Sequence, residues 1–128
     1  MKIIEKIKPE FVDERGGITK LLDDGKTNIK STLLITSKAG SIRSNHYHKK
    51  DAHWIYMISG KMEYYEKPVN SKTKPKKIII DAGDMVYTPP MAIHATKFLK
   101  DSVIIALSIK SRNQAAYEED TVRVKLIE

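Results

Sequence analysis

The chain has 128 residues, of which 41% are hydrophobic and 30% are charged, as is ordinary for a globular protein. It contains no cysteine, which excludes disulfides, thiolate metal ligands and a cysteine nucleophile and agrees with a reducing compartment. No apolar run reaches the roughly 18 residues that a membrane-spanning helix needs, and the first residues lack the apolar stretch of a secretion signal. We therefore expect one cytoplasmic domain over residues 1–128, with no membrane partner.

Most of the formal net charge of +7 is concentrated in one segment. Residues 67–77 contain five lysines and no acidic residue, and they lie between two strand-like runs. A surface for nucleic acid needs basic residues along a face, with arginine and aromatic residues interleaved. The pattern instead predicts a solvated hairpin loop, so nucleic acid is not an expected partner.

Short β-like runs separated by turn signals recur along the chain. Only residues 111–120 have room for a helical turn. Many short strands with closely spaced turns predict an all-β sandwich or small barrel rather than a sheet with crossover helices. The predicted strands cover residues 3–7, 18–22, 30–36, 42–47, 54–58, 61–66, 76–80, 84–87, 94–99, 103–109 and 121–127.

The four histidines are grouped rather than scattered, since three of them fall within eight residues. If the strand at 42–47 runs on, His46 and His48 point to the same face, because side chains two apart on a strand do so. His53 precedes the next apolar strand, and His94 begins another after two prolines. Two imidazoles on one strand face, with two more nearby, form a natural start for a divalent metal site.

The spacing of these residues resembles the two motifs of the cupin superfamily. Gly40-x5-His46-x-His48-x4-His53-x6-Gly60 is similar to the first motif, G-x5-H-x-H-x3–4-E-x6-G. The second motif, G-x5-P-x-G-x2-H-x3-N, resembles Gly83-x5-Pro89-x-Met91-x2-His94-x3-Phe98. Together the motifs occupy residues 40–60 and 83–98. The resemblance implies a single-domain cupin, a jelly-roll barrel also described as a double-stranded β-helix.

The resemblance also implies one divalent transition metal at the barrel mouth, held by His46, His48, His53 and His94. Three positions depart from the family pattern: His53 replaces a glutamate, Met91 a glycine and Phe98 an asparagine. Without the carboxylate, a two-histidine, one-carboxylate site is not expected. The metal is left open among Zn, Ni, Fe, Mn and Cu.

A second resemblance concerns cupins that act on nucleotide-linked sugars, the epimerases and ketoisomerases of the RmlC-like group. Phe11-Val-Asp-Glu-Arg-Gly-Gly17 and His46-Tyr-His48-Lys49-Lys50 are similar to segments of those enzymes. In them, histidines at the barrel mouth act as acid and base without a metal. Carried over, His46 and His48 would be the base candidates, and the tyrosines Tyr56, Tyr64 or Tyr87 would supply the acid.

Alternation along the strands suggests which side chains surround the histidines. If His53 points inward, so do Ile55 and Met57, while Trp54 and Tyr56 face the other layer or a partner subunit. Phe98 shares a face with His94. The expected lining of the pocket is Arg43, Ile55, Met57, Met91 and Phe98.

The leading functional hypothesis is a metal-dependent isomerase, epimerase or lyase acting on a small carbonyl, hydroxy or sugar-type compound. Three alternatives stay open: an iron-dependent dioxygenase, a metal-free acid/base enzyme for sugar nucleotides, and a cupin that binds a small ligand without catalysis. We also expect a homodimer, because the hydrophobic strands at 3–7 and 122–127 would leave exposed edges.

Overall fold

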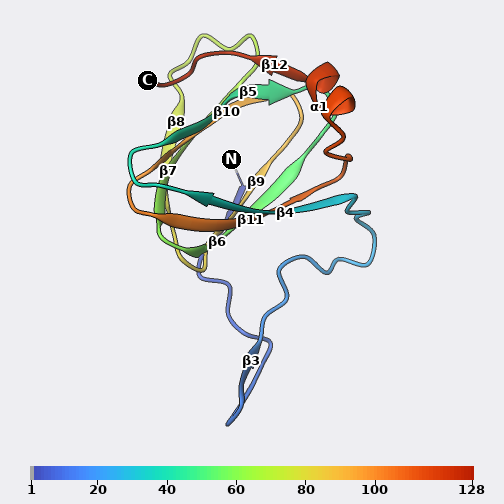
Figure 1. Ribbon diagram of the computed structural model, residues 1–128, viewed down its shortest axis with the longest axis vertical. Helices are drawn as coiled ribbons and strands as arrows, with labels where there is room; N and C mark the ends of the chain where they lie inside the picture. The colour runs from blue at the N-terminus through green and yellow to red at the C-terminus, as the bar shows by residue number, and fades with distance from the viewer. Residues whose placement is uncertain (1) are drawn as a thin grey trace.

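Two antiparallel sheets of five strands each face one another in the computed structural model, which describes residues 2–128 (Figure 1). The first sheet contains, in spatial order, β1 (Lys2–Ile4), β9 (Met85–Thr88), β6 (His53–Ser59), β11 (Ser102–Ser108) and β4 (Ser31–Ser37). The second contains β12 (Thr121–Arg123), β5 (Ile42–His48), β10 (Ala92–Phe98), β7 (Lys61–Pro68) and β8 (Lys76–Asp81). This architecture confirms the predicted all-β jelly roll.

The core lies between the two sheets and follows from the period of two along each strand. On β6, for example, His53, Ile55 and Met57 are buried while the residues between them are partly exposed. Across the chain, the inward-facing apolar side chains form one cluster: Ile55, Met57, Met62, Tyr64, Ile80, Val86, Phe98, Ile104 and Ala106. Burial of these side chains supplies the main stabilisation of the sandwich.

The outer face of the first sheet is also apolar. Trp54 on β6 pairs with Tyr87 on β9, and their ring centroids lie 4.7 Å apart. Ile105 on β11 pairs with Tyr56 and with Leu34, whose side chain is 71% exposed. A sheet that packs on a core usually carries polar residues on its other face, so this exposed apolar face is unusual.

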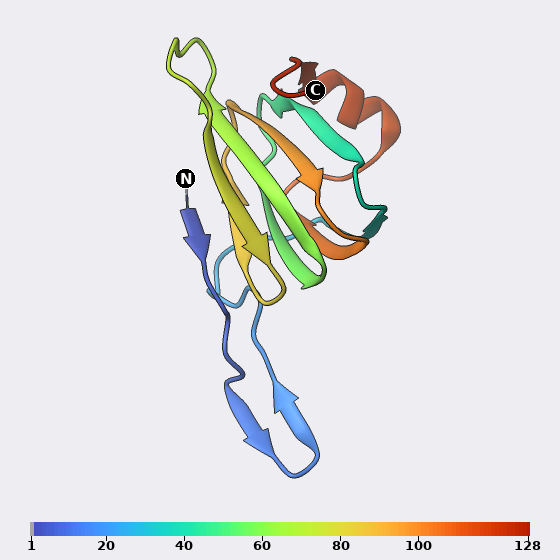
Figure 2. The same ribbon diagram turned by 90° about the vertical axis from the view of Figure 1, so that its left-hand side faces the viewer.

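A hairpin near the N-terminus projects away from the two sheets (Figures 1 and 2). It consists of β2 (Phe11–Asp13) and β3 (Gly16–Ile18), which pair only with each other. The predicted strand at 18–22 is therefore wrong, because residues after 18 leave the hairpin without a strand partner. Phe11, Val12 and Ile18 are between 50% and 66% exposed. An isolated two-stranded hairpin with exposed apolar side chains is only marginally stable in water.

The single helix of residues 2–128, α1 (Gln114–Asp120), leads directly into β12 at the edge of the second sheet (Figure 2). It begins at Asn113, whose side-chain oxygen accepts a hydrogen bond from the amide of Ala116. The pairing of β12 with β5 then fixes the helix near the end of the sandwich at which β5 ends. Within the described residues, no helix has the length and apolar character needed to cross a membrane.

Candidate active site

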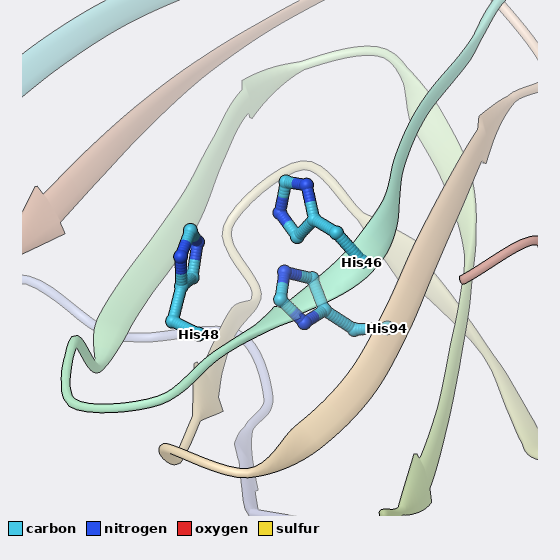
Figure 3. A group of neighbouring side chains, drawn as sticks. All are labelled: His46, His48 and His94. Carbon is cyan, nitrogen blue, oxygen red and sulfur yellow. The ribbon is translucent and has the colours of Figure 1, made fainter. Parts of the chain in front are cut away.

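The structure brings the four histidines together between the two sheets. His46 and His48 come from β5, His94 from β10 and His53 from β6 of the opposite sheet. The ring centroid of His46 lies 4.7 Å from that of His48 and 4.8 Å from that of His94. Figure 3 shows these three rings turned toward one another. The predicted grouping of the histidines is thus present in three dimensions.

The hydrogen bonds of His94 determine its tautomer. Its Nδ1 lies 3.0 Å from the carbonyl oxygen of Ala92, which can only accept, so Nδ1 carries the proton. In the neutral ring, Nε2 then accepts a hydrogen bond from Nε2 of His53 at 3.3 Å. This leaves Nδ1 of His53 without a proton. The nitrogen is buried, and its lone pair has no hydrogen-bond partner in the described part of the chain.

His48 is held by residues at the junction of α1 and β12. The hydroxyl of Thr121 donates to the carbonyl oxygen of Tyr117 at 2.6 Å. Because that hydroxyl has one proton, it accepts the second bond, from Nδ1 of His48 at 3.2 Å. A carboxylate oxygen of Asp120 lies 3.8 Å from the same nitrogen. Neutral His48 therefore keeps a free lone pair on Nε2, which has no hydrogen-bond partner among residues 2–128.

Burial keeps the histidines neutral at physiological pH. It lowers the pKa of His46 to about 3 and that of His94 to about 4, with further lowering from neighbouring imidazoles. The fully buried His53 has a pKa well below its usual value for the same reason. Burial also lowers the pKa of His48, but Asp51 and Asp120 oppose this effect. Neutral imidazoles serve as bases or as metal ligands.

A β-bulge in β5 sets which side chains accompany these histidines. His46 pairs with His94, but Arg43 pairs with Thr96, so one extra residue lies between them. Ser44 and Asn45 both have positive φ angles, of 70° and 56°. The bulge cancels the usual alternation, and Arg43 faces the same side as His46 although the two are three residues apart. The predicted position of Arg43 beside the histidines therefore depends on this bulge.

Three of the four histidines, His46, His48 and His53, border a cavity of about 180 Å³. One part of its wall is apolar and consists of Leu33, Ile35, Ile55, Ile104 and Ala106. The other part is polar and includes Arg43, Thr96, Asp51, Arg112 and Tyr117 as well as His46, His48 and His53. A cavity with one apolar and one charged wall fits a small polar organic ligand with a carbon skeleton.

Tyr117 and Arg112 are site residues that the sequence did not reveal. The ring of Tyr117 lies over His48 and His46, with centroid distances of 5.5 Å and 6.3 Å. The guanidinium of Arg112 lies over the ring of Tyr117, with its carbon 3.7 Å from the ring centroid. Both residues belong to the segment 111–120, which lacks the periodicity of a strand. From its sequence we predicted only that it has room for a helical turn.

All three of the predicted acid candidates lie away from this cavity. The hydroxyl of Tyr64 is buried and donates to Glu66 at 2.6 Å, with Thr88 also at 2.6 Å, and burial raises its pKa. Tyr87 points outward, because it shares the outer face of the first sheet with Trp54. Tyr56 lies on that same outer face. None of these hydroxyls lines the histidine cavity.

Three of the five predicted lining residues also lie elsewhere. Met57 and Phe98 have the predicted inward orientation, but both belong to the packed core and are at most 1% exposed. Met91 lies in the turn before β10, where it has a φ of 61° and is 46% exposed. Alternation identifies the inward face of a strand, but it does not show which inward residues line the cavity and which belong to the packed core.

The donor set fits a metal ion held by three of the four histidines. His46, His48 and His94 each offer a nitrogen within 4.8 Å of the others, and three histidines are the protein ligands of some catalytic zinc sites. His53 does not complete this set. Binding through Nε2 would move its proton to Nδ1, which is buried without an acceptor, and a metal on His94 would displace the bond between the two rings.

Comparisons with known proteins agree with the architecture. The family model described as a cupin domain matches residues 33–110. QdtA, a sugar 3,4-ketoisomerase from Thermoanaerobacterium thermosaccharolyticum in complex with TDP, has 20% identity and a TM-score of 0.75, over 95% of this chain and 86% of that one. A 3,4-ketoisomerase from Helicobacter canadensis has 19% identity and a TM-score of 0.77, over 95% and 89%.

A third solved structure, dTDP-4-dehydrorhamnose 3,5-epimerase from Sulfolobus tokodaii, has 21% identity and a TM-score of 0.69, over 83% of this chain and 69% of that one. At such identities the likeness is one of fold. No curated protein matches the sequence of this chain.

Proposed function

The chain belongs to the cupin domain family, and on this premise we propose that it is an isomerase or epimerase that moves protons beside the carbonyl group of a nucleotide-linked keto sugar. The observation that carries the proposal is the state of His48. Its Nδ1 is anchored by Thr121, and its Nε2 has a free lone pair at a cavity of small-molecule size. A neutral, oriented imidazole can act as the general base that removes a proton next to a carbonyl.

Other residues of the same polar wall would supply the remaining chemistry. Tyr117 is the tyrosine that lines the histidine cavity in the described chain, and its hydroxyl is our candidate for the acid that returns a proton. Arg43 and Arg112 carry positive charge on the same cavity, where an enolate oxygen would gain from it. Solved structures of similar fold include enzymes named as sugar 3,4-ketoisomerases and a 3,5-epimerase, which supports this substrate class.

The test is proton exchange in deuterated water. TDP-4-keto-6-deoxyglucose, the compound bound in one QdtA structure, serves as the probe. We expect the protein to place deuterium on a carbon beside the carbonyl, as followed by NMR, and to convert the sugar to an isomer. The assay is run on protein as purified and after chelation, with the metal content measured in both. The proposal would be contradicted if exchange were absent from the protein as purified, from the chelated protein and from the chelated protein after metal is added back.

A second candidate is the metal-dependent version of this activity, favoured by the three-histidine cluster. A divalent ion there would act as a Lewis acid on a carbonyl oxygen. Exchange that disappears on chelation and returns with Zn, Ni or Mn would favour this version. Oxygen uptake with Fe would indicate the dioxygenase alternative, and TDP binding without turnover would indicate a binding protein.

We also infer that two copies of the chain associate through the outer face of the first sheet, where Trp54, Tyr56, Ile105 and Leu34 form a continuous apolar surface. Neither this face nor the projecting hairpin is covered within residues 2–128. Stable interfaces between proteins bury surfaces of this kind, with aromatic residues near their centre.

Light scattering during size-exclusion chromatography tests this association. The wild-type protein is expected at twice the 14.6 kDa mass of the chain, and Leu34→Glu at the single mass, because the new charge would be buried in the interface. Ile79→Glu is the matched control, since Ile79 is an exposed apolar residue on the second sheet. A monomeric wild type would contradict the inferred interface.

A further inference from the structure

A second hollow adjoins the histidine cavity and is lined by four lysines. Its volume is about 560 Å³, and Asp51 and Tyr117 belong to the walls of both spaces. The lysines come from three separate parts of the chain, before β4, after β5 and after β11. They are Lys30, Lys49, Lys50 and Lys110.

Backbone hydrogen bonds bring these three segments together. The amide of Lys30 donates to the carbonyl of Ser108 at 2.9 Å. The amides of Lys50 and Lys110 donate to the carboxylates of Asp120 and Asp51, at 2.8 Å and 3.1 Å. The convergence of the lysines thus follows from the backbone, and it does not require their side chains to find partners.

The side chains of these four lysines carry no ion pair or hydrogen bond within residues 2–128, whereas Lys20, Lys61 and Lys77 elsewhere all do. Three acidic residues, Asp51, Glu119 and Asp120, also line the hollow. Two of them are already used by the backbone amides of the walls. Four lysines therefore line one space together with three carboxylates, and their ammonium groups keep hydrogen-bond donors for a ligand.

We propose that this lysine-lined hollow binds the diphosphate of the nucleotide-linked substrate while the sugar occupies the histidine cavity, an inference that rests on the proposed function. A diphosphate offers several charged acceptor oxygens to the lysine donors. The shared wall of Asp51 and Tyr117 places the anionic part of a ligand directly beside its neutral part. Arg112, which borders the histidine cavity and stacks on Tyr117, adds positive charge at the junction.

Calorimetric titration with TDP tests the proposal without requiring turnover. The double variant Lys49→Ala/Lys50→Ala removes two lysines of the hollow. The control Lys72→Ala/Lys74→Ala removes the same charge from the exposed loop at 67–77. We expect the first variant to raise the Kd for TDP at least about tenfold and the control to change it by less than about twofold, because only the first removes donors that contact the ligand.

Thymidine and pyrophosphate identify which part of the ligand the lysines recognise. Thymidine, which lacks phosphate, is expected to bind equally weakly to both double variants. Pyrophosphate is expected to bind more weakly to the Lys49/Lys50 variant; if it binds wild type as tightly as TDP does, the site serves free diphosphate as well. Unchanged TDP binding in that variant, or equal weakening in both double variants, would overturn the site.

The outcomes also separate this inference from the proposed function. Lysine-dependent TDP binding without any proton exchange would retain the diphosphate site and reject the isomerase. Proton exchange with the same KM in the Lys49/Lys50 variant and in wild type would retain the isomerase and reject the diphosphate site.

Discussion

His48→Asn is expected to slow deuterium incorporation into the keto sugar by about a thousandfold, the usual contribution of a positioned general base. Asparagine retains a polar group near Thr121 but has no lone pair basic enough to accept a proton from carbon. The free Nε2 of His48 is the group whose loss this variant isolates. The measurement is the initial exchange rate by NMR at saturating substrate, together with the Kd for TDP.

Tyr47→Phe is the control for this experiment. Tyr47 is the neighbour of His48 on β5, it lies on the opposite face of the strand, and its side chain does not line the cavity. The control is expected to retain the wild-type rate, and both variants should bind TDP as wild type does. A His48→Asn protein with normal TDP binding and more than a tenth of the wild-type rate would show that another group removes the proton.

Acidification from pH 7 to pH 5 is expected to lower the free energy of unfolding by about 2 kcal/mol through His94 alone. In the folded state its pKa is lowered from 6.5 to about 4, and the side chain is fully buried. A histidine with a lowered folded pKa contributes full stability above its unfolded pKa. That contribution is lost as pH falls below 6.5, because only the unfolded chain then binds the proton. His53, lowered for the same reason, adds to the loss.

Urea unfolding at fixed protein concentration measures this effect at pH 7, 6 and 5. His94→Gln should reduce the pH dependence by roughly the share assigned to His94. Each variant is compared with itself across pH, so a constant loss of stability from the substitution does not affect the result. Equal pH dependence in wild type and His94→Gln would show that His94 is protonated in the folded protein near its ordinary pKa.

The strands and the histidine cluster could be predicted because both follow from local spacing. His46 and His48 share a face whenever β5 is a strand, and their distance from His94 in sequence matches a known pair of motifs. The pairing of His46 with His94 across β5 and β10 agrees with that expectation. The hairpin was harder, since three-residue strands such as β2 are too short to show alternation.

The rest of the site depends on depth and on irregular backbone, which spacing does not encode. Phe98 and Met57 share the predicted inward faces, yet they lie in the core below the cavity. Tyr117 reaches the histidines only because the hydrogen bond from Thr121 and the pairing of β12 hold α1 there. Hydrogen bonds between residues more than seventy positions apart, such as that between His48 and Thr121, leave no local pattern.

The bulge at Ser44 and Asn45 has a consequence for how the cavity wall can diverge among relatives. Asn45 is the residue without a partner on β10, and this extra residue brings Arg43, three positions from His46, to the inward face. Loss of Asn45 would remove the bulge and leave Arg43 two residues from His46, so strict alternation would still turn the guanidinium inward. Relatives can therefore lose the bulge through a single-codon deletion without changing the charge of this wall, the histidines on β5 or their pairing with β10.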